Sequence, residues 1–243
     1  MQVTGILPAA GYATRLAGRV SGSKELLPVA GRPVIEHSAA VMQTAGVAEV
    51  RVVTRPAKDD LIAYATSRGW RLVLGEPPTA AASVLLGVDG LPPDAAVLVA
   101  FPDTVFDAAD PFTLLLQQLT GSVETVLGLF HSPVPSAGDV VDVEWAAESN
   151  AAESDSAGTP VGIVHRVEPK PAHPTTDLIW SLLAARRCAL DGLEHVSEVG
   201  HLLDELAQAG SVRGVLLPGR LLDIGTPEGL AQARKPASRV AHN

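Results

Sequence analysis

The sequence predicts an α/β protein with a mostly parallel β-sheet flanked by helices. Strand-like and helix-like segments alternate along the first half of the chain, at a spacing typical of right-handed β-α-β units. The run 95–100 is continuously apolar, as expected for a strand buried on both faces. Aromatic residues make up only 4% of the chain, so Ala, Val and Leu must fill the core.

The elements expected in the first half follow one another closely. We predict strands at Val3–Leu7, Val50–Thr54, Arg71–Leu74 and Ala95–Ala100. We predict helices at Pro33–Thr44, Lys58–Arg68, Ala80–Val88 and Asp110–Leu119. Pro33 suits the first turn of its helix, and Asp110 followed by Pro111 suits an N-cap and the first helical position.

The second half is richer in strands. We predict them at Val123–Phe130, Asp139–Glu144 and Val161–Val167, with an acidic loop over 146–160 that contains mostly Ala, Ser, Glu and Asp. A length of 243 residues fits one α/β domain spanning 1–243 better than two independent domains. We therefore treat 1–122 and 123–243 as two parts of a single domain.

Composition excludes several functions. The net charge of −9 argues against a partner that is a nucleic acid or an anionic membrane. No apolar run reaches the roughly 20 residues of a membrane span. The N-terminus does not have the pattern of a secretory signal, and a single cysteine permits no internal disulfide. We expect a cytoplasmic protein.

The first 35 residues carry four basic side chains, Arg15, Arg19, Lys24 and Arg32, and one acid, Glu25. This local excess would suit a small polyanion, although basic residues also cluster by chance. We expect Glu25, beside Lys24, to be a solvated charge.

The chemistry is concentrated in LPAAGYATRL, from Leu7, and SKELLPVAGRPV, from Ser23. A strand that runs into a turn of small residues lets a ligand approach the backbone, whose N–H groups can cradle phosphate. Arg15 offers a planar fork for phosphate oxygens, and Lys24 offers a mobile positive charge. Neither GxxxxGK[ST] nor GxGxxG occurs, so this is neither a P-loop nor a dinucleotide fingerprint.

These two segments resemble the signature of the sugar-1-phosphate nucleotidyltransferases, especially the glucose-1-phosphate thymidylyl- and uridylyltransferases. The resemblance implies a Rossmann-like, GT-A-like fold in which 1–122 binds the nucleotide and 123–243 forms a strand-rich sugar-binding part with C-terminal helices. It makes Arg15 and Lys24 catalytic, and it places the nucleotide against the turn residues Leu7, Ala9, Ala10 and Gly11. Ala13 departs from the family, which usually has Gly there.

Two further segments match the family's metal ligands. Asp103 in VLVAFPDTVF follows an apolar strand, and Asp223 lies in RLLDIGTPEGL. The resemblance implies that both hold Mg²⁺, a cation that prefers carboxylate and phosphate oxygens. Taken alone, an Asp after a strand is more often a turn or cap residue, and Thr226-Pro227-Glu228 could simply cap a C-terminal helix.

The last matches concern substrate choice. IVHRVEPKP resembles Glu-Glu-Lys-Pro, so the resemblance makes Lys170 the contact of the sugar phosphate, with Glu168 near the sugar. Pro169 stands where the family has the Glu that hydrogen-bonds sugar hydroxyls. PSAGDVVDVE places Gly138 near the sugar, and Ala137 replaces an aromatic residue.

Glu76 and Ala81 in EPPTAAASVLLG occupy roughly the places of the base-reading Gln and of the Gly beside the base. The base is therefore left open, with dTTP or UTP favoured by the resemblance.

The sequence thus predicts a Mg²⁺-dependent enzyme that transfers a nucleoside monophosphate from an NTP to a sugar 1-phosphate. The loss of the carboxylate at Pro169 points to an unusual sugar or a cyclitol phosphate. Two alternatives remain: a cytidylyltransferase for a polyol phosphate, and a non-catalytic regulatory subunit that binds nucleotide sugars. A homo-oligomer is a further possibility, because the apolar stretch 177–185 could be either an association surface or core.

Overall fold

The computed structural model describes residues 2–12, 22–146 and 158–233. Ala13, Arg15 and most of the acidic segment lie outside the described residues. None of the helices in the described ranges has the length and apolarity needed to cross a membrane.

The strands are β1 Val3–Pro8, β2 Pro28–Val29, β3 Arg32–Pro33, β4 Glu49–Thr54, β5 Arg71–Leu74, β6 Ala96–Ala100, β7 Thr104–Phe106, β8 Thr125–His131, β9 Val140–Trp145, β10 Val161–Glu168, β11 Leu178–Arg186, β12 Val212–Leu216 and β13 Leu221–Asp223. The α-helices are α1 Ile35–Thr44, α2 Asp59–Ser67, α3 Ala80–Val88, α4 Pro111–Gln118, α5 Val199–Gln208 and α6 Pro227–Ala233. Within the described residues there are also three 3-10 helices: η2 Lys24–Leu26, η3 Pro135–Ala137 and η4 Arg187–His195.

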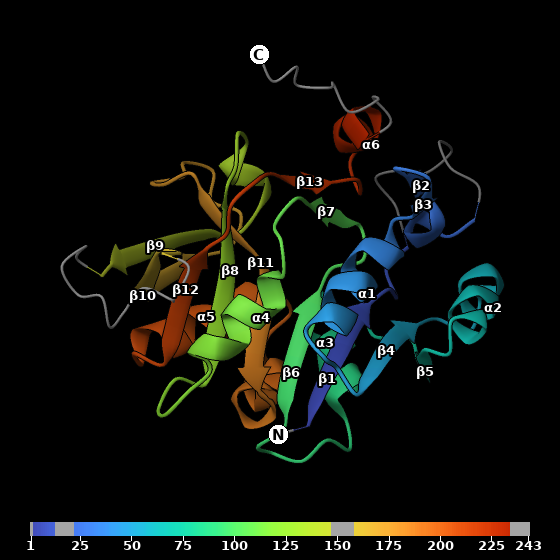
Figure 1. Ribbon diagram of the computed structural model, residues 1–243, viewed down its shortest axis with the longest axis horizontal. Coiled ribbons are helices and arrows are strands. Elements are labelled where there is room, and N and C mark those ends of the chain that lie inside the picture. The colour runs from blue at the N-terminus through green and yellow to red at the C-terminus, as the bar shows by residue number, and fades with distance from the viewer. Residues whose placement is uncertain (1, 13–21, 147–157, 234–243) are drawn as a thin grey trace.

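A nine-stranded sheet forms the centre of the molecule, in the order β5-β4-β1-β6-β11-β8-β12-β10-β9 (Figure 1). The first four strands in this order, from β5 to β6, are parallel to one another. Strand β11 then pairs antiparallel with both β6 and β8. Strand β12 is parallel to β8, and β10 is antiparallel to both β12 and β9. Only β11 and β10 therefore run against the common direction, which confirms the predicted α/β fold with a mostly parallel sheet.

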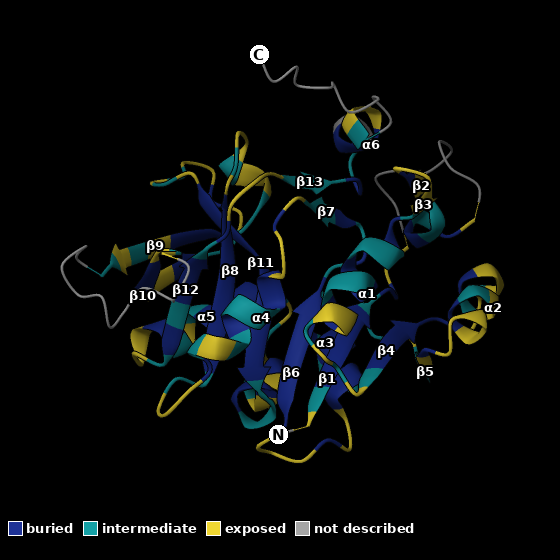
Figure 2. Cartoon of the chain, viewed as in Figure 1, coloured by how far each residue is buried: buried dark blue, intermediate teal, exposed yellow. Residues whose placement is uncertain are grey.

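Helices cover both faces of this sheet. Along β6, Val97 and Val99 pack into one core with α3, η4 and α5, whereas Ala96, Leu98 and Ala100 pack into the other with α1, α2 and α4. This alternation follows from the two-residue period of a strand. The central strands are therefore buried on both sides (Figure 2), as the apolar run 95–100 indicates.

Of two local expectations at helix starts, one is wrong and one is confirmed. Pro33 belongs to β3, because Ala30 and Gly31 form a tight turn with φ values of 47° and 82° that pairs Val29 with Arg32. Helix α1 consequently begins at Ile35. The second expectation is confirmed, because Asp110 is the N-cap of α4 and Pro111 is its first residue. Asp110 has a left-handed φ of 44°, and its side chain makes no capping hydrogen bond.

The stretch 177–185 is core rather than an association surface. Apart from exposed Asp177, it lies in β11, and Leu178 to Ala185 are all buried between β6 and β8. The structure therefore removes the reason for proposing self-association through this segment.

Candidate functional site

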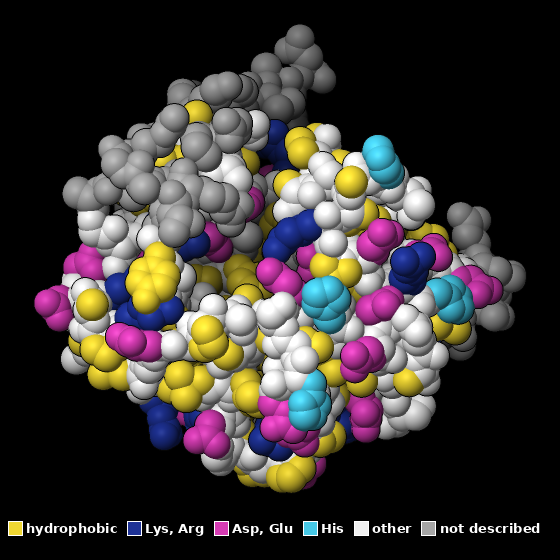
Figure 3. Space-filling model, turned by 180° about the vertical axis from the view of Figure 1, so that it is seen from behind, with side chains coloured by type: hydrophobic (Ala, Val, Ile, Leu, Met, Phe, Trp, Pro, Cys, Tyr) yellow, Lys and Arg dark blue, Asp and Glu magenta, His cyan; other side chains and the backbone are white. Residues whose placement is uncertain are grey.

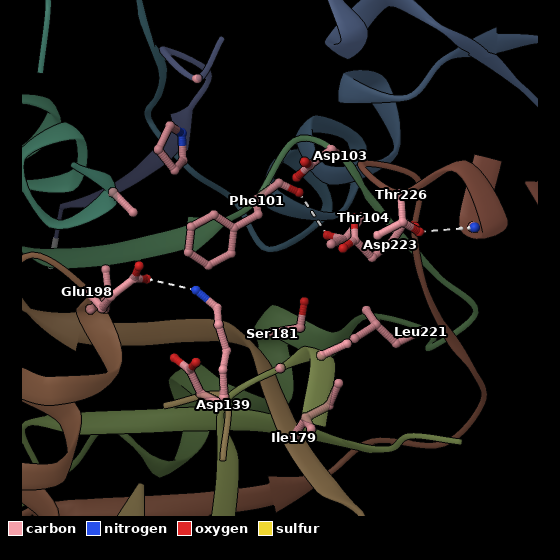
Figure 4. A pocket seen from close by; sticks show the side chains of 18 of the residues that line it. Phe101, Asp103, Thr104, Asp139, Ile179, Ser181, Glu198, Leu221, Asp223 and Thr226 are labelled. Atoms are coloured by element: carbon pink, nitrogen blue, oxygen red, sulfur yellow. Dashed lines mark hydrogen bonds and ion pairs between the residues drawn. The ribbon is translucent and has the colours of Figure 1, made fainter. Parts of the chain in front are cut away.

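A cavity of about 940 Å³ opens at the carboxyl ends of β1, β4 and β6, where parallel sheets bind ligands. From behind, the molecule shows apolar side chains in a hollow whose rim carries basic and acidic groups (Figure 3). Asp103, Asp223 and Thr226 lie at one end of the cavity, Asp139 and Glu198 at the other, with Phe101 and Ser181 between them (Figure 4).

Two basic side chains from the loop that follows β4 hydrogen-bond to the backbone of the turn after β1. Lys58 Nζ donates to the carbonyl of Ala9 at 2.7 Å, and Arg55 Nε donates to that of Ala10 at 2.6 Å. Arg55 also donates to the carbonyl of Pro77 at 3.0 Å, and its guanidinium lies 3.9 Å from the centre of the Tyr12 ring. These contacts fix the backbone of the small-residue turn beside the cavity.

Glu25 is not a solvated charge, so that expectation is wrong. Its side chain is fully buried, and Lys58 Nζ donates to its two carboxylate oxygens at 2.9 and 3.0 Å. Burial raises the pKa of Glu25, although attraction to Lys58 opposes the rise. The residue lies in the short 3-10 helix η2, which turns its side chain inward while neighbouring Lys24 faces the cavity.

Lys58→Met should destabilise the fold by about 3–5 kcal/mol, because it leaves the carboxylate of Glu25 buried without its partner. The pKa of Glu25 is raised above 4.5 in the folded state, which therefore holds this proton more tightly than the unfolded chain. Stability attributable to Glu25 consequently falls as pH rises above that value. Lowering the pH from about 8 to about 5 favours the protonated, uncharged form of Glu25, which needs no cationic partner. The loss in free energy of unfolding caused by Lys58→Met, measured by urea unfolding, should therefore become smaller over this range.

The double variant Glu25→Gln/Lys58→Met is the control for this coupling. It removes both charges, so it should be more stable than Lys58→Met alone. A double variant that loses at least as much stability as the single one would show that the ion pair is not the cause.

Pairing of β7 with β13 brings Asp103 and Asp223 together. Asp103 immediately precedes β7, Asp223 ends β13, and Asp223 is the register partner of Thr104. The backbone N–H of Ile224 donates to the carbonyl of Asp103 at 2.9 Å. A Cβ placed on Gly225 would lie 2.7 Å from Asp103 Oδ2 and 2.9 Å from Asp223 Oδ1, so both carboxylates face one small space.

Lys24 completes this end of the cavity, with its Nζ 2.5 Å from Asp103 Oδ2. Burial alone would lower the pKa of Lys24, but attraction to Asp103, Glu25 and Asp223 outweighs it and the pKa is raised. Lys24 therefore stays protonated.

The residues fit Mg²⁺ bound jointly with a substrate. No group of three or more His, Cys, Asp or Glu side chains with metal-binding geometry occurs among the described residues. Mg²⁺, however, commonly takes one or two carboxylates and completes its shell with substrate phosphates and water. Asp103 and Asp223 match that arrangement, and the cavity beside them has room for a nucleotide.

The other end of the cavity contains Lys170, as the resemblance implies. Lys170 follows β10 with a left-handed φ of 44°, a conformation that costs energy in a residue other than Gly and occurs often at functional sites. Its Nζ donates to Glu198 Oε2 at 3.1 Å. Gly138 also lines the cavity and packs on Ile179, and a Cβ there would lie 3.2 Å from Ile179 Cδ1.

Of the residues predicted to contact the nucleotide or the sugar, some line the cavity and others do not. Ala10 and Gly11 line the cavity, whereas the side chains of Leu7, Ala9 and Ala81 are buried in the core. Glu76 is exposed and Glu168 half-buried, and neither is among the described residues that line the cavity. Arg15 lies outside the described residues.

The sequence reasoning missed the residues that support the expected ones. Arg55, Lys58 and Glu198 belong to no motif that we recognised, although each hydrogen-bonds to a residue in one. Asp139 lies in the segment PSAGDVVDVE, but we assigned it no role there. The signal for Asp139 was its place directly after Gly138 at the start of a strand. Thr226 does cap a helix, as the simpler interpretation held, because its Oγ1 accepts from the N–H of Gly229 at 3.1 Å.

Known proteins agree with this architecture. The chain is similar over 96% of its length to an apo UDP-glucose pyrophosphorylase, with a TM-score of 0.79, 16% identity and 97% of that chain covered. A putative glucose-1-phosphate thymidylyltransferase from Bacillus anthracis has a TM-score of 0.78 and 17% identity, with 95% of this chain and 93% of that chain covered. A UTP-bound UGPase from Acinetobacter baumannii has a TM-score of 0.74 and 18% identity, with 96% of this chain and 92% of that chain covered.

The TM-scores show that these proteins share the fold, and at such low identity they show the fold alone. No curated protein matches by sequence. Residues 5–209, most of the chain, match the MobA-like NTP transferase domain, which confirms the resemblance at the level of family and fold. The protein therefore belongs to the family of the MobA-like NTP transferase domain.

Proposed function

We propose that the protein transfers a nucleoside monophosphate from an NTP to a sugar 1-phosphate and releases pyrophosphate, with Mg²⁺ as cofactor. The observation that carries this proposal is the convergence of Lys24, Asp103 and Asp223 in one cavity, between the clamped turn after β1 and Lys170. The NTP would lie over the turn, and the sugar phosphate would lie toward Lys170.

The chain's own residues then have separate tasks. Arg15 would bind the leaving pyrophosphate, and Lys24 would offset charge as it develops on the transferred phosphoryl group. Bound Mg²⁺, held by Asp103 and Asp223, would supply charge stabilisation on the phosphate oxygens.

Lys170 would orient the acceptor so that its phosphate oxygen forms a bond to the α-phosphorus in line with the breaking bond to pyrophosphate. Positioning and charge stabilisation suffice for this reaction, without a covalent enzyme intermediate.

The structural neighbours support UTP and dTTP as first choices. One is bound to UTP, one is complexed with UDP-glucose, and one is named as a putative glucose-1-phosphate thymidylyltransferase. Glu76 is exposed and is not among the described residues that line the cavity, so its base-reading role stays a prediction.

The proposal predicts pyrophosphate release that requires an NTP, a sugar 1-phosphate and Mg²⁺ together. The assay combines dTTP, UTP, CTP, GTP and ATP in turn with a panel of sugar 1-phosphates that begins with glucose 1-phosphate, and a chelator should abolish release. CTP with a polyol phosphate is the arm for the cytidylyltransferase alternative. Nucleotide binding without release from any pair would support the regulatory alternative, and no nucleotide binding would refute the proposal.

A further inference from the structure

The sugar-phosphate end of the cavity contains a carboxylate that no family motif supplies. Asp139 follows Gly138, immediately before β9, and lines the cavity. The family's carboxylate stands one residue before the lysine that binds phosphate, and here that residue is Pro169. If an acceptor binds beside Lys170, some other group must receive hydrogen bonds from its polar substituents.

Asp139 is held firmly in this place. Trp180 Nε1 donates to Asp139 Oδ2 at 3.2 Å, and the backbone N–H of Trp180 donates to the Asp139 carbonyl at 3.3 Å. The Trp180 ring packs against Phe101 with ring centres 5.7 Å apart, and both rings line the cavity. The carboxylate thus has a defined position beside an apolar surface, as in many small-molecule sites.

Asp139 also lies next to the position that has lost its carboxylate. Gly200, near the start of α5, lies against both: a Cβ there would collide with Asp139 Oδ2 and would lie 3.1 Å from Pro169 Cγ. Gly200 therefore leaves room for Asp139 beside Pro169. The carboxylate of Asp139, from the residue before β9, therefore lies beside the place from which the family's carboxylate would extend.

The charges at this end of the cavity leave Asp139 able to take another donor. Burial, together with the nearby Glu198, raises the pKa of Asp139 above its usual range, although Lys170, Trp180 and His201 oppose the rise. The amine of Lys170 is already hydrogen-bonded to Glu198. A buried polar group without enough hydrogen-bond partners costs free energy. A hydroxyl or ammonium group of the bound sugar phosphate that donates to the Asp139 carboxylate would therefore offset the cost of its desolvation.

We propose that Asp139 determines acceptor specificity by receiving hydrogen bonds from hydroxyl or ammonium groups of the acceptor, in place of the carboxylate absent at Pro169. This inference rests on the proposed function, since it assumes that the Lys170 end of the cavity holds the acceptor. The two kinds of donor are distinguished by probes that differ in one group, glucose 1-phosphate and glucosamine 1-phosphate.

The test is calorimetric titration of the wild type and Asp139→Asn with each probe, in the presence of Mg²⁺ and UTP's non-hydrolysable α,β-methylene analogue. Asn can still accept from Trp180, so the fold should persist. We expect binding of at least one probe to weaken roughly tenfold, while binding of the nucleotide analogue stays unchanged. An equal loss for both probes indicates a hydroxyl, and a larger loss for glucosamine 1-phosphate indicates its ammonium group.

Two further variants separate recognition from structure. Asp142→Asn removes an exposed carboxylate three residues along the chain, in β9, and should leave binding of both probes unchanged. Adding Pro169→Glu to Asp139→Asn returns a carboxylate to the family's position and should restore much of the lost affinity, which a merely structural defect would not allow.

The inference is overturned if Asp139→Asn binds both probes as the wild type does, if nucleotide binding falls in parallel, or if the wild type binds neither probe. Because these are binding measurements, they decide the role of Asp139 independently of turnover. Failure of the proposed function would show instead as absent pyrophosphate release by the wild type.

Discussion

Asp103→Asn should slow pyrophosphate release roughly 10³-fold while leaving the fold intact. The substitution preserves shape but removes the charge that Lys24 contacts at 2.5 Å and that, with Asp223, would bind Mg²⁺. Asp103 is only partly buried, and its backbone carbonyl still accepts from the N–H of Ile224. The loss should therefore fall on turnover rather than on the free energy of unfolding.

The measurement is the initial rate of pyrophosphate release as a function of Mg²⁺ concentration, together with a thermal melt. Asp107→Asn is the matched control, because Asp107 lies just beyond β7 and its exposed side chain is only a distant partner of Arg220 at 3.8 Å. Asp103→Asn with activity like that of the wild type would refute the assigned metal site.

Gly225→Ala should reduce turnover about 10²-fold with little change in melting temperature. The new methyl group would need the space now occupied by Asp103 Oδ2 and Asp223 Oδ1, at 2.7 and 2.9 Å. Both atoms end short side chains that can rotate away, so the fold accommodates the change readily. The two carboxylates would then be displaced from each other and from the phosphates.

Higher Mg²⁺ should recover part of the activity of Gly225→Ala, because the ligands are displaced rather than removed. Asp103→Asn should recover much less under the same conditions. If Gly225→Ala retained full activity, or if it lost activity only by unfolding, the shared space between the two carboxylates would have no role in the reaction.

Much of the fold could be predicted because it depends on local patterns. The apolar run 95–100 and the boundaries of β5 and α3 follow from periodicity and turn residues. The antiparallel insertion of β11 between β6 and β8 could not be predicted in this way, since strand order is set by contacts between distant segments. The apolar sequence of β11 is equally consistent with an exposed surface patch. The sequence alone therefore does not decide whether this stretch is core or a surface for self-association.

The site shows the same division. Asp103, Asp223 and Lys170 could be named from motifs, because a reaction with phosphates restricts which residue types can serve. Glu25 was misinterpreted because its partner Lys58 lies in another element, and nothing local distinguishes a buried carboxylate from a solvated one. Asp139 was overlooked because its significance depends on Gly200 and Pro169, which only the fold brings beside it.

The pairing of β7 with β13 also sets an order of events during synthesis. The turn after β1 and its contacts with Arg55 and Lys58 involve only the first quarter of the chain, so they can form early on the ribosome. Asp103 meets Asp223 only after β13 has been made. The two carboxylates of the proposed metal site are therefore brought together later in synthesis than the turn over which the nucleotide would lie.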